Sequence, residues 1–350
     1  MFTALVLQHF RSYTQKKFEF HPKLTIIVGK NTAGKTNMVE SVMLLSSGKS
    51  FRADKDFQMI QFGQEVGRVQ GLVEINKEKT KLEIVLAQQE AAGGRFIKKY
   101  LVNDIARTRN HFVGNLPAVL FRPEELDIIV DGPSMRREFL NSVLESVDAE
   151  YRIAKTIYDK VLRQRNALLY VTRETGKRNI AQFEYWDELL ITNGQKITKK
   201  RNEFIEFINA AKKDVFDCKI IYDKSTISED RLVQYKEQEV NAAVTLVGPQ
   251  RDDFYVTMKT KGGEQNVQHF GSRGQQRLVI LQLKLLHILF VEQKLHVNPL
   301  LVLDDIFSEL DTTHIQLVLS KTQDNQTILT TTHKEFVDSH NLKDFAIIEL

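Results

Sequence analysis

Residues 24–36, with the sequence LTIIVGKNTAGKT, join a short run of apolar and β-branched residues to a glycine-containing turn. From Gly29 onward the stretch fits the pattern G-x-x-x-x-G-K-[ST] of the phosphate-binding loop. In such a loop, backbone N–H groups and the N-terminus of the following helix face a phosphate anion. The apolar run predicts the preceding strand, and the residues from Met38 onward predict the helix. The stretch therefore predicts an α/β fold that binds a nucleotide; the alternative is an ordinary strand, turn and helix.

The polar residues of this loop have separate expected roles. We expect the Lys35 ammonium to reach the β- and γ-phosphates and the Thr36 hydroxyl to bind Mg²⁺. ATP and Mg²⁺ are therefore the expected cofactors. The residues expected to contact ATP are Gly29, Lys30, Asn31, Thr32, Ala33, Gly34, Lys35, Thr36 and Asn37.

A second candidate site follows the apolar run at residues 300–303, which ends in the carboxylates Asp304 and Asp305. Open α/β sheets bind their ligands at the carboxyl ends of the strands, where both side chains are expected to lie. Asp304 suits the Mg²⁺ ion of a nucleotide, and Asp305 is placed to orient or deprotonate an attacking water. Considered alone, the segment is equally consistent with a strand followed by an acidic turn.

A third candidate segment, GSRGQQR at residues 271–277, opens a long apolar helix. Ser272 is a good N-cap residue, so a purely structural role is one interpretation. The other is that its hydroxyl, nearby N–H groups and the positive end of the helix dipole contact a γ-phosphate. Because the chain already has a phosphate-binding loop, this surface suits the nucleotide of a second subunit.

The hydrophobic pattern predicts a discontinuous sheet domain with an inserted helical arm. Paired strands are expected near Leu5 and Phe18, and a meander over residues 66–102, which form a β-rich flank. The middle is glycine-poor and amphipathic, and we expect it to be all helical. Toward the C-terminus we expect a hairpin over residues 254–267, a buried helix from about Gln275, and strands at residues 300–303 and 327–331. The expected domains are a discontinuous sheet domain with the phosphate-binding loop over residues 1–125 and 241–350 and a helical arm over residues 126–240.

Composition limits the class of protein without deciding the function. The chain has 350 residues, 42% of them hydrophobic, and a formal charge of +4, which together exclude a mainly disordered chain and make only a weak argument for nucleic acid. One cysteine, Cys218, excludes an internal disulfide and sites built on several thiolates. The N-terminus lacks the basic region of a signal peptide, and the longest apolar stretch is too short to span a membrane. We therefore expect a cytoplasmic protein without a membrane partner.

Several further motifs occur together with the three candidate segments. The motifs are KTN at residues 35–37, SFR at 50–52, FRPE at 121–124, GPS at 132–134, RR at 136–137, QRN at 164–166, GPQRDD at 248–253, SRGQ at 272–275, LDD at 303–305 and SELD at 308–311. Together they resemble the RecF family of bacterial DNA replication and repair proteins, in the family's order and at about its total length.

The resemblance implies an ABC-type ATPase head, related to the heads of SMC proteins, with a helical lobe in place of their coiled coil. In that family ATP joins two heads face to face, and the closed homodimer grips DNA. Carried over by position, Lys35 and Asp305 are catalytic, and Thr36 and Asp304 hold the metal ion. The signature residues that act on the partner's nucleotide are Ser272, Arg273, Gly274 and Gln275.

Two more positions receive a role from the resemblance. Asp311 corresponds to the D-loop, and His333 lies at about the place of the ABC switch histidine and is counted with the catalytic residues. For His333, a helix-capping turn after a strand is an equal alternative. Thr32 stands where the family usually has glycine, and Gln250 where histidine is common, so we expect weaker or slower nucleotide handling at most.

The function implied by the resemblance is ATP-dependent DNA binding in recombinational repair and replication, including the SOS response. The expected partners are duplex DNA beside single-stranded gaps, a second copy of the chain, and RecR and RecO in recombinase loading, with slow, DNA-stimulated ATP hydrolysis. A P-loop kinase or another small-molecule phosphotransferase is the alternative, but a monomeric kinase has no use for a second phosphate-facing serine such as Ser272. A transporter's nucleotide-binding subunit is disfavoured because the arm is too long and the signature begins Ser-Arg-Gly.

Overall fold

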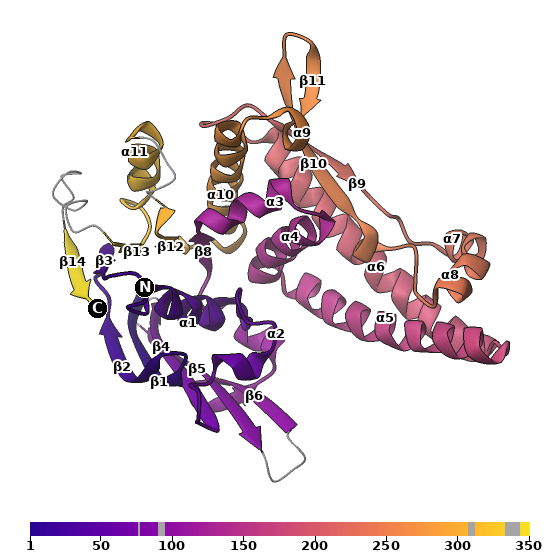
Figure 1. Cartoon of the computed structure of the whole chain (residues 1–350), viewed down its shortest axis with the longest axis horizontal. Coiled ribbons are helices and arrows are strands. Elements are labelled where there is room, and N and C mark those ends of the chain that lie inside the picture. The colour runs from indigo at the N-terminus through magenta and orange to yellow at the C-terminus, as the bar shows by residue number, and fades with distance from the viewer. Residues whose placement is uncertain (76–77, 90–94, 307–311, 333–343) are drawn as a thin grey trace. The chain divides into compact units, whose positions relative to one another are not determined.

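The computed structural model describes residues 1–75, 78–89, 95–306, 312–332 and 344–350 (Figure 1). Internal contacts divide the chain into two compact units, Met1–Glu125 with His287–Leu350, and Leu126–Leu286. The first boundary coincides with the expected domain boundary. The second boundary lies at 286/287 instead of 240/241, because a strand before residue 240 pairs with a strand after it, as described below.

A five-stranded sheet, in which every neighbouring pair is parallel, organises the first unit. Its order is β14-β3-β13-β12-β8, and its three central strands are buried at every position except Val28, as is typical of parallel strands covered on both faces. The strands expected at residues 24–28, 300–303 and 327–331 are confirmed, whereas the two edge strands were not predicted. The bounds are β3 Leu24–Val28, β8 Ala118–Phe121, β12 Leu300–Asp304, β13 Thr327–Thr331 and β14 Phe345–Glu349.

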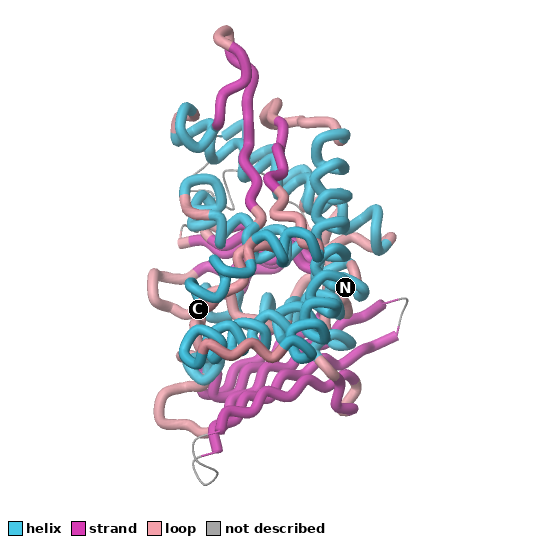
Figure 2. Tube along the Cα trace, turned by 90° about the vertical axis from the view of Figure 1, so that its right-hand side faces the viewer, coloured by secondary structure: helices cyan, strands magenta, loops and turns pink. Residues whose placement is uncertain are grey.

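A six-stranded antiparallel sheet is the β-rich flank of the same unit, and Figure 2 shows its strands side by side in one layer at the bottom of the view. Its order is β2-β1-β4-β5-β6-β7, and Leu5 of β1 pairs with Phe18 of β2, as the sequence predicted. The expected meander is also confirmed. The bounds are β1 Phe2–Phe10, β2 Tyr13–Glu19, β4 Val66–Ile75, β5 Glu78–Gln89, β6 Arg95–Val102 and β7 Ile105–Arg107.

Helix α1 (Lys35–Ser47) follows the phosphate-binding loop and packs against strands of both sheets. Its apolar side chains are buried in a core shared with the two sheets. Gly71 of β4 allows this close packing, because an added Cβ there would lie 2.6 Å from Leu45 Cδ1 and 2.7 Å from Phe2 Cε2. The core therefore fixes the helix that carries the phosphate-binding loop. Among the described residues, the other α-helices of the unit are α2 Arg109–Phe112, α11 Thr312–Lys321 and the end of α10, residues 287–295.

The second unit is built around two long helices, α5 and α6, which pack side by side (Figure 1). Asp148 caps the N-terminus of α5 by accepting from Tyr151 N at 3.0 Å, and Gly176 ends it with a φ of 68°. The helices of this unit are α3 Asp127–Val130, α4 Pro133–Val147, α5 Ala149–Thr175, α6 Ile180–Ala210, α7 Glu229–Gln234, α8 Lys236–Ala242, α9 Val267–Phe270 and the start of α10 Arg273–Leu295. Among the described residues, none of the helices is both long enough and apolar enough to cross a membrane.

The expectation of an all-helical arm was wrong, because strand β9 (Lys219–Asp223) lies within it. This strand pairs antiparallel with β10 (Asp253–Thr260), which forms the expected hairpin with β11 (Gly263–Asn266). The pairing explains why residues 241–286 pack with the second unit. A five-residue strand whose only fully buried side chain is Ile220 gives little periodic signal.

A buried cation links several elements of the second unit. Arg201 of α6 is 2% exposed, and its NH1 lies 2.8 Å from Asp252 Oδ2 and donates to Pro249 O at 2.7 Å. Its NH2 donates to Asn141 Oδ1 of α4 at 2.8 Å, and its Nε to Tyr151 Oη of α5 at 3.2 Å. Because Asp252 is also fully buried, each charge depends on the other for solvation.

We expect Arg201→Met to lower the free energy of unfolding of the second unit by about 3–5 kcal/mol, because it leaves the Asp252 carboxylate buried without its charge partner. Urea unfolding followed by far-UV circular dichroism measures this loss as a lower transition midpoint. Lys199→Met, at an exposed position of the same helix, is the matched control and should leave the midpoint unchanged. Equal midpoints for the two variants would contradict the assignment.

Candidate phosphate and magnesium site

The loop between β3 and α1 has the backbone form of a phosphate-binding loop. Gly34, at the N-cap of α1, has a φ of 102°, and Thr32 has a φ of 75°. Glycine adopts this left-handed region without cost, whereas threonine is strained there by about 1–3 kcal/mol. The structure thus gives a physical reason for the glycine that the RecF family usually has at the position of Thr32.

Lys35 is buried at the start of α1, and its ammonium is held against the loop. Its Nζ donates to Gly29 O at 2.5 Å and to Lys30 O at 3.1 Å. The N–H of Gly29 donates to Thr331 O of the neighbouring strand β13 at 3.3 Å, which fixes the start of the loop on the sheet. A cation and the first turn of a helix therefore meet at the carboxyl end of β3, an arrangement that suits an anionic phosphate.

Tyr13 of β2 and Ser12 of the turn before it support the loop and the first turn of α1. Tyr13 donates from its hydroxyl to Gly34 O at 3.1 Å, and its burial raises the pKa of the phenol to about 12. A Cβ at Gly34 would lie 2.7 Å from the Tyr13 hydroxyl, so this position needs glycine for space as well as for its positive φ. Asn37 donates to Ser12 Oγ at 2.9 Å and accepts from Arg52 NH1 at 3.0 Å.

Asp304, at the carboxyl end of β12, lies in contact with the first turn of α1. Its carboxyl group accepts a hydrogen bond from Thr330 Oγ1 of β13 at 2.6 Å, and the neighbouring Thr36 hydroxyl also lowers its pKa. Burial raises the pKa of Asp304, and the negative charges of Glu124 and Asp305 raise it further, while the two hydroxyl groups oppose the shift. The structure thus brings together Thr36 and Asp304, the two residues predicted to hold Mg²⁺.

The second carboxylate, Asp305, leaves the strand in a left-handed conformation with a φ of 51°. Its backbone N–H donates to Thr330 Oγ1 at 3.2 Å. Thr330 therefore binds both members of the acidic pair and fixes the turn after Asp304. Sequence reasoning had not singled out this side chain, although its place one residue before the end of β13 puts it at the same edge of the sheet.

The chemistry of these groups fits Mg²⁺. A threonine hydroxyl and a carboxylate are hard oxygen ligands, and Mg²⁺ is usually held in proteins by one or two such groups, with water and phosphate oxygens completing the octahedron. Consistent with this mode, the described part of the chain has no cluster of three or more His, Cys, Asp or Glu side chains that could enclose a metal ion by itself.

The signature segment begins α10 in the second unit, and Ser272 caps that helix. Gln275 N donates to Ser272 Oγ at 3.3 Å, and Ser272 N donates to Gln275 Oε1 at 2.9 Å, which together form a capping box. The structural role considered for Ser272 is therefore present. Ser272, Arg273 and Gly274 are also exposed, so the cap leaves this surface available to a ligand. Asp311 and His333 lie outside the described residues.

A cavity of about 760 Å³ lies beside the first turn of α1, where Ser12 and Asn37 line it. Arg11 forms part of its wall and is fixed by two hydrogen bonds to the buried Glu40, at 2.8 and 2.6 Å. The sequence analysis did not predict this cavity. Its lining includes Phe62, whose side chain is fully exposed, and this exposure can be recognised only in the structure. The lining residues are Arg11, Ser12, Asn37, Phe57, Gln58, Ile60, Gln61, Phe62, Gly63, Gln64, Glu65 and Gln88.

Known proteins are similar in sequence to this chain over almost its whole length. A family model described as RecF/RecN/SMC N terminal domain matches residues 1–345. A protein of Bacillus mycoides (strain KBAB4) named DNA replication and repair protein RecF is 30% identical, over 99% of this chain and 96% of that protein. One of Ligilactobacillus salivarius (strain UCC118) with the same name is 34% identical, over 93% of this chain and 89% of that protein. The chain belongs to the RecF family.

Solved structures of RecF agree with this assignment. A structure described as the recombination mediator protein RecF-ATPrS in the RecFOR pathway is 28% identical, covers 100% of this chain and 96% of its own, and superposes with a TM-score of 0.88. A second, described as RecF-ATP in the same pathway, gives a TM-score of 0.87 at 28% identity, over 99% of this chain and 95% of its own. The predicted fold class, an ABC-type ATPase head with a β-rich flank and a helical arm, is confirmed. Membership of a family of DNA replication and repair proteins also disfavours the phosphotransferase alternative.

We expect Thr330→Val to weaken Mg²⁺-dependent nucleotide binding and to move its pH dependence upward. The Thr330 hydroxyl lowers the pKa of Asp304, so its loss raises that pKa further and lets protons compete with Mg²⁺ at higher pH. Titration with a fluorescent ATP analogue from acidic to alkaline pH, with Mg²⁺ or with EDTA, measures both effects.

The matched control is Thr327→Val, a buried threonine at the other end of the same strand, which bonds to Asn325 O rather than to an acidic residue. It should retain the pH profile of the unaltered protein. The expectation fails if Thr330→Val shows the same profile, or if it weakens binding equally with EDTA.

Proposed function

We propose that this chain is an ATP-dependent DNA-binding protein of recombinational DNA repair and replication, which closes as an ATP-bound homodimer on duplex DNA. The observation that carries the proposal is the contact between Thr36 of the phosphate-binding loop and the buried Asp304 of β12. This contact supports binding of a nucleotide with its metal ion. The similarity to RecF structures whose descriptions include ATP supports the identity of the nucleotide.

Each group of the site has a role in this proposal. Lys35 and the backbone N–H groups of the loop bind the β- and γ-phosphates, while Thr36 and Asp304 hold Mg²⁺. The metal ion, when bound, neutralises charge on the phosphate oxygens. Asp305 orients the attacking water and accepts its proton. Thr330 fixes both carboxylates through the bonds described above.

The cavity beside the loop suits the nucleoside part of ATP. Phe57, Ile60 and Phe62 supply apolar and aromatic surface for a base, and Gln58 and Gln61 supply amide groups for its polar edge. Its contact with the loop through Asn37 places this surface next to the proposed phosphate site. We propose that the loop and this cavity together hold the whole nucleotide within the first unit.

The signature segment at residues 272–275 is the basis of the proposed homodimer. We infer that Ser272, Arg273, Gly274 and Gln275 contact the nucleotide of the partner copy, with Asp311 and His333 contributing to the same closed site. Since these contacts exist only in the dimer, ATP stabilises the dimer, and hydrolysis removes that stabilisation. Hydrolysis should be slow, stimulated by DNA and dependent on protein concentration.

The DNA and protein partners are also part of the proposal. Lysine and arginine contacts to phosphates would bind duplex DNA beside single-stranded gaps without reading the bases, so affinity should fall with salt by about 0.9 log units per contact per log unit of salt. The related solved structures are described as parts of the RecFOR pathway, which supports RecR and RecO as partners in recombinase loading.

We expect Ser272→Arg to abolish ATP-dependent dimerisation while leaving ATP binding by the single chain intact, because its bulk and charge disturb only the surface offered to the partner. Analytical ultracentrifugation with ATP and Mg²⁺ measures the dimer, and a fluorescent ATP analogue measures binding. Lys35→Ala, the comparison variant, should lose both. A dimer that persists in Ser272→Arg would remove the signature from the interface.

We expect Asp305→Asn to bind ATP normally but to hydrolyse it at least about a hundred-fold more slowly, since the amide cannot accept the proton of the attacking water. The ATP-bound dimer should then accumulate on DNA, as measured by sedimentation with labelled duplex. Asp324→Asn, at a distant exposed turn, is the charge-matched control. Normal turnover in Asp305→Asn would reassign the base.

A further inference from the structure

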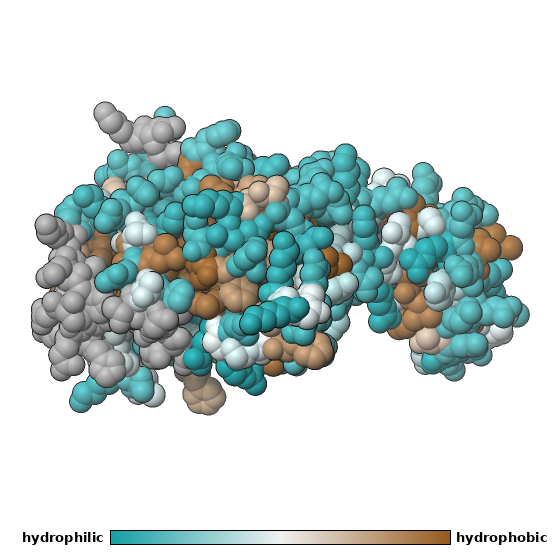
Figure 3. All heavy atoms as spheres, turned by 90° about the horizontal axis from the view of Figure 1, so that it is seen from above, coloured by the Kyte–Doolittle hydropathy of each residue, from teal (hydrophilic) through white to brown (hydrophobic). Residues whose placement is uncertain are grey.

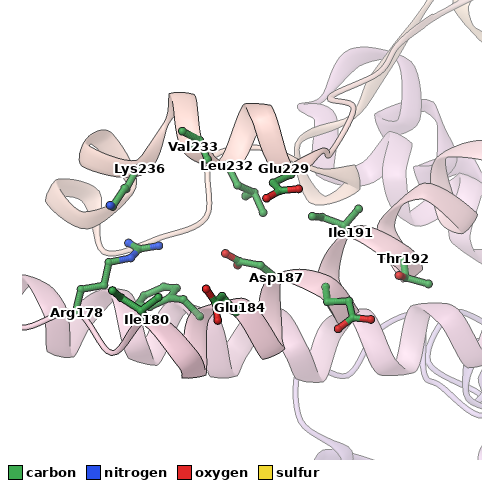
Figure 4. Close-up of a pocket in the computed structure, with 12 residues that line it drawn as sticks. Arg178, Ile180, Glu184, Asp187, Ile191, Thr192, Glu229, Leu232, Val233 and Lys236 are labelled. Carbon is green, nitrogen blue, oxygen red and sulfur yellow. The ribbon is translucent and has the colours of Figure 1, made fainter.

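A cavity of about 480 Å³ lies in the second unit, far along the chain from every residue of the nucleotide site. Its walls come from the first half of α6 and from the short helices α7 and α8 (Figure 4). This volume falls within the range of ordinary ligand pockets. The lining residues are Arg178, Ile180, Phe183, Glu184, Asp187, Glu188, Ile191, Thr192, Glu229, Leu232, Val233 and Lys236.

The cavity has an apolar floor and an apolar rim. Phe183 and Leu232 are buried beneath it, while Ile180 and Val233 are 67% and 68% exposed. Apolar residues also interrupt the hydrophilic surface at the right-hand end in Figure 3, the end that carries α7 and α8 in Figure 1. Exposed apolar side chains around a preformed hollow are typical of a surface that is covered by a partner.

A buried ion network holds the walls in place. Arg165 of α5 is fully buried; its Nε lies 2.5 Å from Asp187 Oδ1 of α6, and its NH2 lies 2.7 Å from Glu239 Oε2 of α8. Its NH1 also donates to Thr245 Oγ1 at 2.9 Å. The helices on either side of the cavity are thus joined through one side chain. Because its walls are already fixed, the side chains that line the cavity lose little conformational entropy when a ligand binds.

The charges around the cavity are unequal. Glu184, Glu188 and Glu229 form no ion pair within the described part of the chain, and Asp187 adds a fourth carboxylate that is engaged by Arg165. The two cations, Arg178 and Lys236, lie together at the left in Figure 4, while Glu229 lies toward the other side. The Arg178 guanidinium is stacked 3.7 Å from the centroid of Phe183, which holds it over the floor.

These features select among the classes of occupant. Unpaired carboxylates repel the phosphates of nucleic acid, and the described residues include no cluster able to hold a metal ion. An apolar floor beside free carboxylates instead complements a large apolar side chain next to a lysine or an arginine. We propose that this cavity is a docking site for a short basic segment of a partner protein, which inserts leucine, isoleucine or phenylalanine side chains between α6 and α7.

The test uses the full chain and a short fluorescein-labelled peptide of leucine and lysine in amphipathic order, with fluorescence anisotropy as the readout. Two comparison peptides replace leucine by serine or lysine by glutamate. We expect the leucine–lysine peptide to bind at least about ten-fold more tightly than either, a difference of about 1.4 kcal/mol. Hydrogen exchange should show protection in α7 and in the first half of α6.

Variants with matched controls locate the binding. Val233→Asp and Glu188→Lys should each weaken the leucine–lysine peptide at least about five-fold, a loss of about 1 kcal/mol. Val171→Asp and Glu203→Lys change similarly exposed residues outside the cavity and should have no effect. Because none of these positions belongs to the nucleotide site, ATP binding should be unchanged in all four.

Three outcomes would overturn the proposal. Equal binding of the serine–lysine peptide would mean attraction by charge alone, and equal losses in the control variants would place the peptide elsewhere. Concentration-dependent self-association without nucleotide that Val233→Asp removes would assign the cavity to a second copy of this chain. Since the readouts need neither ATP nor DNA, each outcome leaves the proposed function untouched.

Discussion

The contact of the Thr36 hydroxyl with the buried Asp304 carboxyl is the interaction on which the nucleotide site depends. It joins the first turn of α1 to the end of β12, two segments separated by most of the sequence. The parallel sheet makes this contact possible, because β3, β13 and β12 are neighbours whose carboxyl ends share one edge. The apolar contacts of α1 with both sheets then hold the helix at that edge.

Burial raises the pKa of Asp304, and the surrounding hydroxyl groups offset part of this rise. Removing the carboxyl group from water favours its neutral form, whereas a metal ligand must be ionised. Thr330 counters the cost of burial and, through its bond to the N–H of Asp305, also sets the path of the chain beyond the strand. Thr330 thus affects both the charge of Asp304 and the backbone position of Asp305.

Much of the first unit could be predicted from the sequence because its signals are local. The strand at residues 300–303 is a continuous apolar run, those at 24–28 and 327–331 are short runs of apolar and β-branched residues, and the loop pattern predicts the turn before α1. Non-local features could not be predicted in this way. Strand β9 becomes recognisable only through its pairing with β10, and the cavities arise from side chains that distant segments bring together. Thr330 is likewise indistinguishable from its neighbours until the register of β12 and β13 is known.

The two fully enclosed arginines of the helical unit restrict how its sequence can diverge. A guanidinium group keeps its proton throughout the physiological range, so neither Arg165 nor Arg201 can escape its surroundings by becoming neutral. Replacement of Asp252 alone would leave the positive charge of Arg201 without its ion-pair partner, whereas replacement of Glu239 alone would leave Arg165 paired with Asp187. Exchange of all members of such a network for apolar residues can be nearly neutral. Substitutions at these positions should therefore occur together. Related sequences should show correlated changes among the residues of each buried ion network.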